Sequence, residues 1–287
     1  MRYFDTHTHA VSTDTTKYPI SPLGGTRSEW SQDHAVDIDG LIRALDDAEV
    51  ESAALVHAST AYGFDNSYAA DALARFPDRL VGVCAVDFLS DTAVTDLQYW
   101  IEERGFTGVR IRAADGTTKV PTPGGGLSDE RMAPIWAYVA EHHVPVCIQM
   151  HSKNTGQLLK VLDVHPGLTI LLDHAGRPNA AGGPPYPLLD ELGRLARYDG
   201  VHLKITPPAL RRLKAEPGAD VTQVLRRLAQ IFGTDKLMWG SNFPASSGSL
   251  RELRDAIEAT LTFLDDEQRA DVLGGNATRI YDLANAR

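Results

Sequence analysis

The sequence predicts an α/β fold, a single-domain (β/α)8 TIM barrel that spans residues 1–287. Short apolar runs rich in β-branched residues alternate with longer amphipathic stretches, which is typical of βαβ units. There are eight such runs, and a length of 287 residues lies in the range of one α/β barrel. No glycine-rich phosphate turn follows the first run, which disfavours an open, doubly wound sheet.

The expected strands are the eight apolar runs in chain order. They are Tyr3 to Asp5, Ser52 to His57, Leu80 to Val86, Thr107 to Ile111, Val144 to Met150, Leu168 to Asp173, Val201 to Ile205 and Leu237 to Gly240. The clearest amphipathic helices between them are Leu41 to Ala48, Tyr68 to Arg75, Met132 to His142, Leu188 to Ala196 and Val221 to Phe232. The long polar stretch Thr13 to His34 is expected to form a loop that acts as a lid over the barrel mouth.

Composition and charge restrict the classes of partner. Hydrophobic residues make up 43% and charged residues 23% of the chain, and the net charge of −10 comes with scattered basic residues. Nucleic acid and anionic membranes require a basic face, so the expected partner is a small, anionic substrate molecule, with a homo-oligomer as an open alternative. The start of the chain has no leader pattern, and Cys84 and Cys147 lie in apolar runs as free thiols, which predicts a cytoplasmic protein.

Four histidines are expected on one rim of the barrel. His7 and His9 end the first strand two residues apart, so both imidazoles face the cavity, and His151 and His174 end two further strands. Because imidazole is the commonest zinc ligand, these four are candidate ligands of a divalent metal such as zinc. A metal-free site is the open alternative.

Two arginines on the fourth strand predict an anionic substrate. Arg110 and Arg112 share one face by the period of two, and buried guanidinium groups require a partner. Arginine is the usual residue for bidentate recognition of a carboxylate, so both are candidate substrate-binding residues. Pairing of either one with an internal carboxylate such as Asp5 is the structural alternative.

Six segments, in order along nearly the whole chain, resemble the amidohydrolase superfamily, in the branch that contains 2-pyrone-4,6-dicarboxylate lactonase and, more distantly, metal-dependent decarboxylases. They are DTHTH at Asp5 to His9, YGFDNSY at Tyr62 to Tyr68, GFTGVRIR at Gly105 to Arg112, HPGLTILLDHAGRP at His165 to Pro178, WGSNFP at Trp239 to Pro244 and GGNATRIYDL at Gly274 to Leu283. The resemblance implies a distorted (β/α)8 barrel and hydrolysis or decarboxylation of a small, often carboxylated, substrate. Tyr62 and Asp65 are further candidate substrate-binding residues, with helix capping as the alternative for Asp65.

One position departs from the superfamily pattern. Members usually carry an aspartate after the eighth strand that binds metal and acts as general base, whereas this chain has Asn242. A neutral amide cannot do both jobs. Three hypotheses follow: the histidines hold a metal while His57 takes the proton; the site is metal-free, with histidine and arginine polarising the ester; or the barrel binds a ligand without catalysis.

The function that the sequence predicts is hydrolysis of a lactone or related ester of a small carboxylated metabolite, with water activated by a histidine-rich site. The candidate catalytic residues are His57, His151, His174 and Asn242. A metal-dependent, non-oxidative decarboxylase and a non-catalytic ligand-binding barrel are the two alternatives.

Overall fold

A computed structural model describes residues 2–113 and 126–281. Eight strands lie in the order β1 to β8, and each pairs in parallel with the next, so the predicted single-domain (β/α)8 barrel is confirmed. The strands are β1 Tyr3–Thr8, β2 Val50–Val56, β3 Leu80–Ala85, β4 Gly108–Arg112, β5 Val146–Gln149, β6 Ile170–Leu172, β7 Val201–Ile205 and β8 Leu237–Trp239. Every expected strand overlaps an observed one.

The barrel closes through the residues that follow β8, because β8 itself is short. The backbone N–H of Asn242 donates to the carbonyl of His7 at 2.8 Å, and that of His9 donates to the carbonyl of Phe243 at 2.8 Å. A side chain at Gly240 would bring its Cβ to 2.8 Å from the Cβ of His7, so this close approach requires glycine. The closure fixes the end of β1 beside Asn242.

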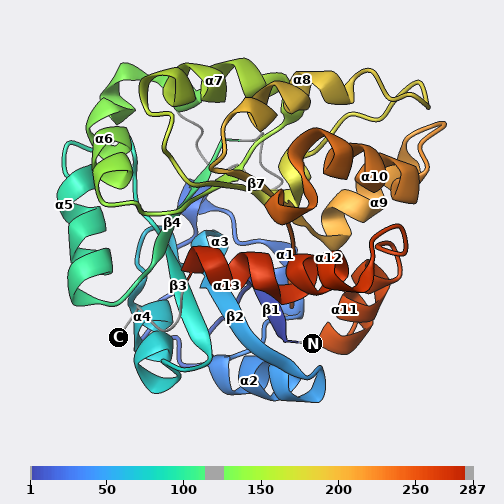
Figure 1. The fold of residues 1–287 in the computed structure, drawn as a ribbon. Coiled ribbons are helices and arrows are strands. Elements are labelled where there is room, and N and C mark those ends of the chain that lie inside the picture. The colour runs from blue at the N-terminus through green and yellow to red at the C-terminus, as the bar shows by residue number, and fades with distance from the viewer. Residues whose placement is uncertain (1, 114–125, 282–287) are drawn as a thin grey trace.

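Helices surround the strands as an outer ring (Figure 1). They are α1 Glu29–Asp33, α2 Ile38–Asp47, α3 Ser59–Tyr62, α4 Ser67–Arg75, α5 Ala93–Gln98, α6 Ala133–Glu141, α7 Thr155–Val164, α8 Leu189–Gly193, α9 Pro207–Ala215, α10 Val221–Phe232, α11 Leu250–Glu258, α12 Asp266–Ala270 and α13 Asn276–Tyr281. The last segment of the sequence resemblance ends at Leu283, outside the described residues. No helix in the two described ranges is both long enough and apolar enough to span a membrane.

The expected lid loop contains the short helix α1. Its Trp30 ring stacks on the imidazole of His9, with ring centroids 5.2 Å apart and planes inclined by 25°. Ser28, just before α1, makes a 2.8 Å hydrogen bond through Oγ to Oγ1 of Thr60 in α3. These contacts hold the segment against the residues that follow β1 and β2.

The barrel interior is apolar at the amino-terminal ends of the strands and charged further along them. The apolar part is closed by α13, whose Tyr281 ring stacks on Phe4 at 5.6 Å and packs among Leu171, Cys147 and their neighbours. A charged layer follows on the same strands and consists of His7, Arg110, Asp173 and Lys204, all buried. A cavity lies beyond this layer, at the carboxyl ends of the strands.

Candidate active site

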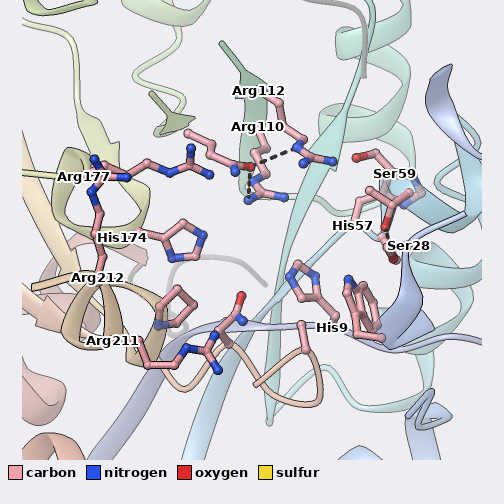
Figure 2. Close-up of a pocket in the computed structure, with 18 residues that line it drawn as sticks. His9, Ser28, His57, Ser59, Arg110, Arg112, His174, Arg177, Arg211 and Arg212 are labelled. Atoms are coloured by element: carbon pink, nitrogen blue, oxygen red, sulfur yellow. Dashed lines mark hydrogen bonds between the residues drawn. The ribbon is translucent and has the colours of Figure 1, made fainter. Parts of the chain in front are cut away.

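A cavity of about 410 Å³ opens where the carboxyl ends of the strands meet, a volume that suits a small metabolite (Figure 2). Its walls come from segments that follow seven of the eight strands or end them. The described lining residues are His9, Ser28, Trp30, His57, Ala58, Ser59, Thr60, Arg110, Arg112, Gln149, His174, Arg177, Pro208, Ala209, Arg211, Arg212, Asn242 and Ala245.

Backbone carbonyls determine the tautomers of two cavity histidines. Nδ1 of His9 lies 2.7 Å from the carbonyl oxygen of Val56, and Nε2 of His57 lies 3.0 Å from that of Gly63. A carbonyl oxygen only accepts, so each of these nitrogens carries the proton. The other nitrogen of each ring, Nε2 of His9 and Nδ1 of His57, therefore has a free lone pair.

The third cavity histidine, His174, follows β6 in the 3-10 turn Asp173–Gly176. Its backbone is left-handed, with φ 55°, which turns the side chain into the cavity and breaks the regular strand-to-helix connection. Nδ1 of His174 lies 2.8 Å from Oγ1 of Thr206. Thr206 precedes α9, but its side chain makes no capping hydrogen bond to that helix, so its hydroxyl is available for the bond to His174.

These imidazoles are neutral near pH 7. Burial lowers the pKa of His57 to about 4. Burial, together with the nearby His7 and Arg110, holds the pKa of His9 and of His174 well below the ordinary histidine value. Neutral rings are available both as proton acceptors and as hydrogen-bond donors.

Below the cavity, the charged layer converges on Asp173. Nε of Arg110 donates to Oδ2 of Asp173 at 2.7 Å, while Nζ of Lys204 and Nδ1 of His7 lie 3.3 Å and 3.2 Å from Oδ1. Burial opposes the ionised carboxylate, but Arg110, His7 and Lys204 together hold the pKa of Asp173 well below its usual range. The sequence alternative, pairing with an internal carboxylate such as Asp5, is observed for Arg110, but the carboxylate is that of Asp173.

Asp5 has a structural role in the closure of the barrel. Its Oδ1 accepts the backbone N–H groups of His7 at 3.0 Å and Ser241 at 2.9 Å, which ties β1 to the segment after β8. Burial raises the pKa of Asp5 to about 6. Its Oδ2 has no hydrogen-bond partner in the described residues.

Five arginines form what we call the arginine wall: Arg110, Arg112, Arg177, Arg211 and Arg212. Both strand-four guanidinium groups donate to Oε1 of Gln149, Arg110 at 3.2 Å and Arg112 at 2.9 Å. Burial, with Arg110 and Arg177 nearby, lowers the pKa of Arg112 to about 9. No aspartate or glutamate occurs among the described residues that line the cavity, so its electrostatics favour an anion.

Six predicted site residues line the cavity and four do not. His57, His174, Asn242, Arg110 and Arg112 line it, as does the predicted metal ligand His9. Among the four others, His7 lies in the charged layer. His151 lies outside the lining, and its Nε2 accepts from Nη1 of Arg177 at 3.0 Å.

Tyr62 and Asp65 also lie outside the described lining. The hydroxyl of Tyr62 accepts the backbone N–H of Ser12 at 2.7 Å, and Oδ1 of Asp65 accepts that of Ser67 at 3.0 Å, at the start of α4. For Asp65 this is the capping alternative.

Sequence reasoning missed several residues of the site. Arg177 follows His174 by three positions in the same motif, and Asp173 immediately precedes it, so the motif contained a signal for both. Arg211 and Arg212 lie in α9 and enter the cavity only through tertiary packing. Ser59 likewise belongs to a helix that follows a strand end.

A family model described as amidohydrolase matches residues 4–283. The chain belongs to the amidohydrolase family. It is therefore an enzyme of the amidohydrolase superfamily, and the resemblance read from the six sequence segments is confirmed.

Two curated proteins are similar to this amidohydrolase. An L-fucono-1,5-lactonase of Burkholderia ambifaria is 26% identical over 228 residues, covering 76% of this chain and 76% of that protein. A 4-sulfomuconolactone hydrolase of Rhizobium radiobacter is 28% identical over 258 residues, covering 85% of this chain and 76% of that protein. A crystal structure of a Burkholderia multivorans amidohydrolase with bound zinc has the same fold, with a TM-score of 0.76, 19% identity and coverage of 98% of this chain and 99% of that one.

Amidohydrolases commonly use a divalent metal, but the donor atoms of this site match one only in part. Nε2 of His7 has no partner in the described residues, which suits a ligand, but the lone pair on Nε2 of His151 is occupied by Arg177 and Asn242 offers a neutral amide. Among residues 2–113 and 126–281, no group of three or more histidine, cysteine, aspartate or glutamate side chains is placed to hold a metal ion. The arrangement does not fit a metal, and the predicted ligands stay a prediction.

Proposed function

We propose that this amidohydrolase hydrolyses a lactone, or a related cyclic or activated ester, of a small carboxylated metabolite. The observation that carries the proposal is the pair His9 and His174, two neutral imidazoles that face one cavity beside the arginine wall. The curated relatives named for lactone hydrolysis support the same reaction class.

In the proposed reaction, His9 is the general base and His174 the oxyanion donor. Nε2 of His9 takes a proton from water as the water oxygen bonds to the lactone carbonyl carbon. The reaction requires the tautomer of His174 in which Nδ1 accepts from the hydroxyl of Thr206, 2.8 Å away, and the N–H on Nε2 donates to the developing oxyanion. One such donor contributes about 3 to 4 kcal/mol to lowering the barrier.

In the second step, the tetrahedral intermediate collapses to the ring-opened product. The ring C–O bond breaks, the carbonyl re-forms, and the leaving alkoxide takes the proton from the His9 imidazolium. The low pKa of His9 favours this return of the proton. The product is a hydroxy acid, which ionises and releases one proton to solvent.

A panel of lactones tests the proposal. Five- and six-membered lactones with and without a carboxylate are offered, and acid release at constant pH is measured together with carbon dioxide. We expect ring opening of carboxylated lactones, and a loss of kcat of about 10²- to 10⁴-fold in His9→Gln. The matched control is His142→Gln, an exposed histidine at the end of α6, which should keep the wild-type rate.

Two results would contradict the proposal. One is carbon dioxide release without ring opening, which would favour the decarboxylase alternative. The other is a wild-type kcat in His9→Gln, which would remove this imidazole from the proton transfer.

A further inference from the structure

We infer that the cavity takes a lactone whose two ends differ, with an anionic group against the arginine wall and hydroxyl groups against a neutral wall. The neutral wall consists of Ser28, Trp30, His57, Ser59 and Thr60. This inference rests on the proposed function and deepens it by naming the substrate class and the residues that select it.

The neutral wall contains a hydroxyl group that lines the cavity and has no hydrogen-bond partner among the described residues. Ser59 is only 4% exposed and lines the cavity, yet its Oγ makes no hydrogen bond with any described residue. Ser28 and Thr60, which are 6% exposed, bond to each other at 2.8 Å. Because Oγ of Ser59 is not enclosed by protein atoms and makes no hydrogen bond to a described residue, it is a binding point for a ligand in the cavity.

The wall suits a hydroxyl better than a carboxylate. His57 presents the lone pair of Nδ1, which needs a donor hydrogen, and an ionised carboxylate has none. A hydroxyl both donates and accepts, so it can satisfy His57 and Ser59 together. None of the five residues of the neutral wall is a cation, so a carboxylate held by these side chains alone would lose hydration without a charged partner.

The opposite side of the cavity has the complementary character. Arg211 makes no hydrogen bond or ion pair with any described residue, and Nε of Arg212 is 3.6 Å from Glu216. The helix that carries them, α9, begins with Pro207 and Pro208, which have no backbone N–H to offer. Anion binding at this side therefore depends on guanidinium groups.

Figure 2 shows that part of the arginine wall faces the neutral wall across the cavity. Arg177, Arg211 and Arg212 lie on one side and Ser28, His57 and Ser59 on the other, while Arg110 and Arg112 lie between these two groups. His174 lies toward the first side and His9 toward the second. A lactone placed between the histidines thus extends toward both walls at once. Its anionic group and its hydroxyl groups must be on opposite ends.

Four six-membered-ring probes that contain no lactone bond separate charge from hydroxyl content. They are methyl glucuronide, which has both, methyl glucoside, cyclohexanecarboxylate and trans-cyclohexane-1,4-dicarboxylate. Calorimetric titration of the purified protein at fixed ionic strength should give the tightest binding for methyl glucuronide, at least about 10-fold tighter than for the other three. Tighter binding of the dicarboxylate would overturn the inference, since it would mean that both walls take anions.

Variants test the assignment of each wall. Ser59→Ala should weaken methyl glucuronide about 5- to 10-fold and leave cyclohexanecarboxylate unchanged. Arg211→Met should weaken both anions to the same extent, while Lys214→Met, an exposed change of the same charge in α9 outside the lining, should weaken neither. Equal loss of both anions in Ser59→Ala would overturn the role of the neutral wall.

The binding result is independent of turnover, because none of the probes contains the lactone or ester bond that the proposed reaction cleaves. If the probes bind as expected and no lactone opens, the proposed reaction is wrong, but the inference that the ligand has an anionic end and a hydroxyl end is supported. If lactones open and the dicarboxylate binds best, only the inference fails.

Discussion

The charged layer inside the barrel and the cavity beyond it use the same kinds of side chain differently. In the layer, Arg110, Lys204 and His7 all approach the single carboxylate of Asp173. His7, Asp173 and Lys204 are closed to solvent, and only Arg110 also reaches the cavity. In the cavity, ring nitrogens such as Nε2 of His9 make no hydrogen bond to a described residue and face the open space.

The difference separates stability from chemistry. Buried charges that have satisfied each other hold the strands in register but cannot act on a substrate. Polar atoms left without partners cost stability and are available to a ligand. We therefore expect substitutions in the layer to lower the free energy of unfolding, and substitutions in the cavity to lower activity.

The largest expected effect is on the cavity side. Replacing His174 with Asn, which tolerates the left-handed backbone at this position, removes the oxyanion donor. We expect kcat for the best lactone to fall about 10²- to 10⁴-fold, with the free energy of unfolding within about 1 kcal/mol of wild type. Steady-state kinetics and urea denaturation measure the two quantities. An unchanged kcat would mean that the cavity histidine His174 does not take part in the reaction.

The next effect is on the layer side. Asp173→Asn leaves Arg110 and Lys204 buried without their counter-charge, and we expect a loss of about 3 to 5 kcal/mol in the free energy of unfolding. Urea denaturation should also show partial recovery when Lys204→Met is added, because one uncompensated charge disappears. Asp39→Asn, which breaks an exposed pair with Arg75, is the control and should cost less than about 1 kcal/mol.

A smaller effect concerns pH. His202 lies two residues before Lys204 on β7, and burial lowers its pKa to about 4. As pH falls from 6.5 to 4, the unfolded chain takes up a proton at this position before the folded chain does, so the folded state loses stability over that window. His202→Gln should reduce the measured loss between pH 6.5 and 4 by about 2 to 3 kcal/mol. An unaltered pH dependence would exclude a neutral, half-buried His202.

The smallest effect tests the support of the oxyanion donor. Thr206→Val keeps the side-chain shape and removes the hydroxyl that bonds to Nδ1 of His174. We expect kcat to fall about 5- to 30-fold with KM nearly unchanged, because the ring loses its fixed tautomer and not its contact with substrate. Thr206→Ser, which restores the hydroxyl, should recover most of the rate.

Much of this architecture could be predicted from the sequence. The eight strands follow from apolar periodicity, and the rule that strand ends face the barrel mouth places His9, His57, His174 and Asn242 in the cavity wall, where they lie. Helix α10 has the bounds predicted for it, Val221–Phe232, because its apolar face repeats regularly.

The rest depends on tertiary packing that periodicity cannot encode. Arg211 is one basic residue among several on α9, and only the position of that helix brings it to the mouth. Lys204 is buried inside the barrel with its charge because the carboxylate of Asp173 lies beside its Nζ. No local sequence pattern reveals this pairing between residues of different strands. His151 follows the end of β5 by two residues, and its Nε2 accepts from Arg177 instead of lining the cavity.

The arginine wall has a consequence for the timing of the catalytic cycle. Ring opening adds a negative charge, so the product would be held by these guanidinium groups more firmly than the substrate that preceded it. Departure of product, and not bond cleavage, would then limit throughput in dilute buffer, and added salt would speed the cycle by screening the attraction.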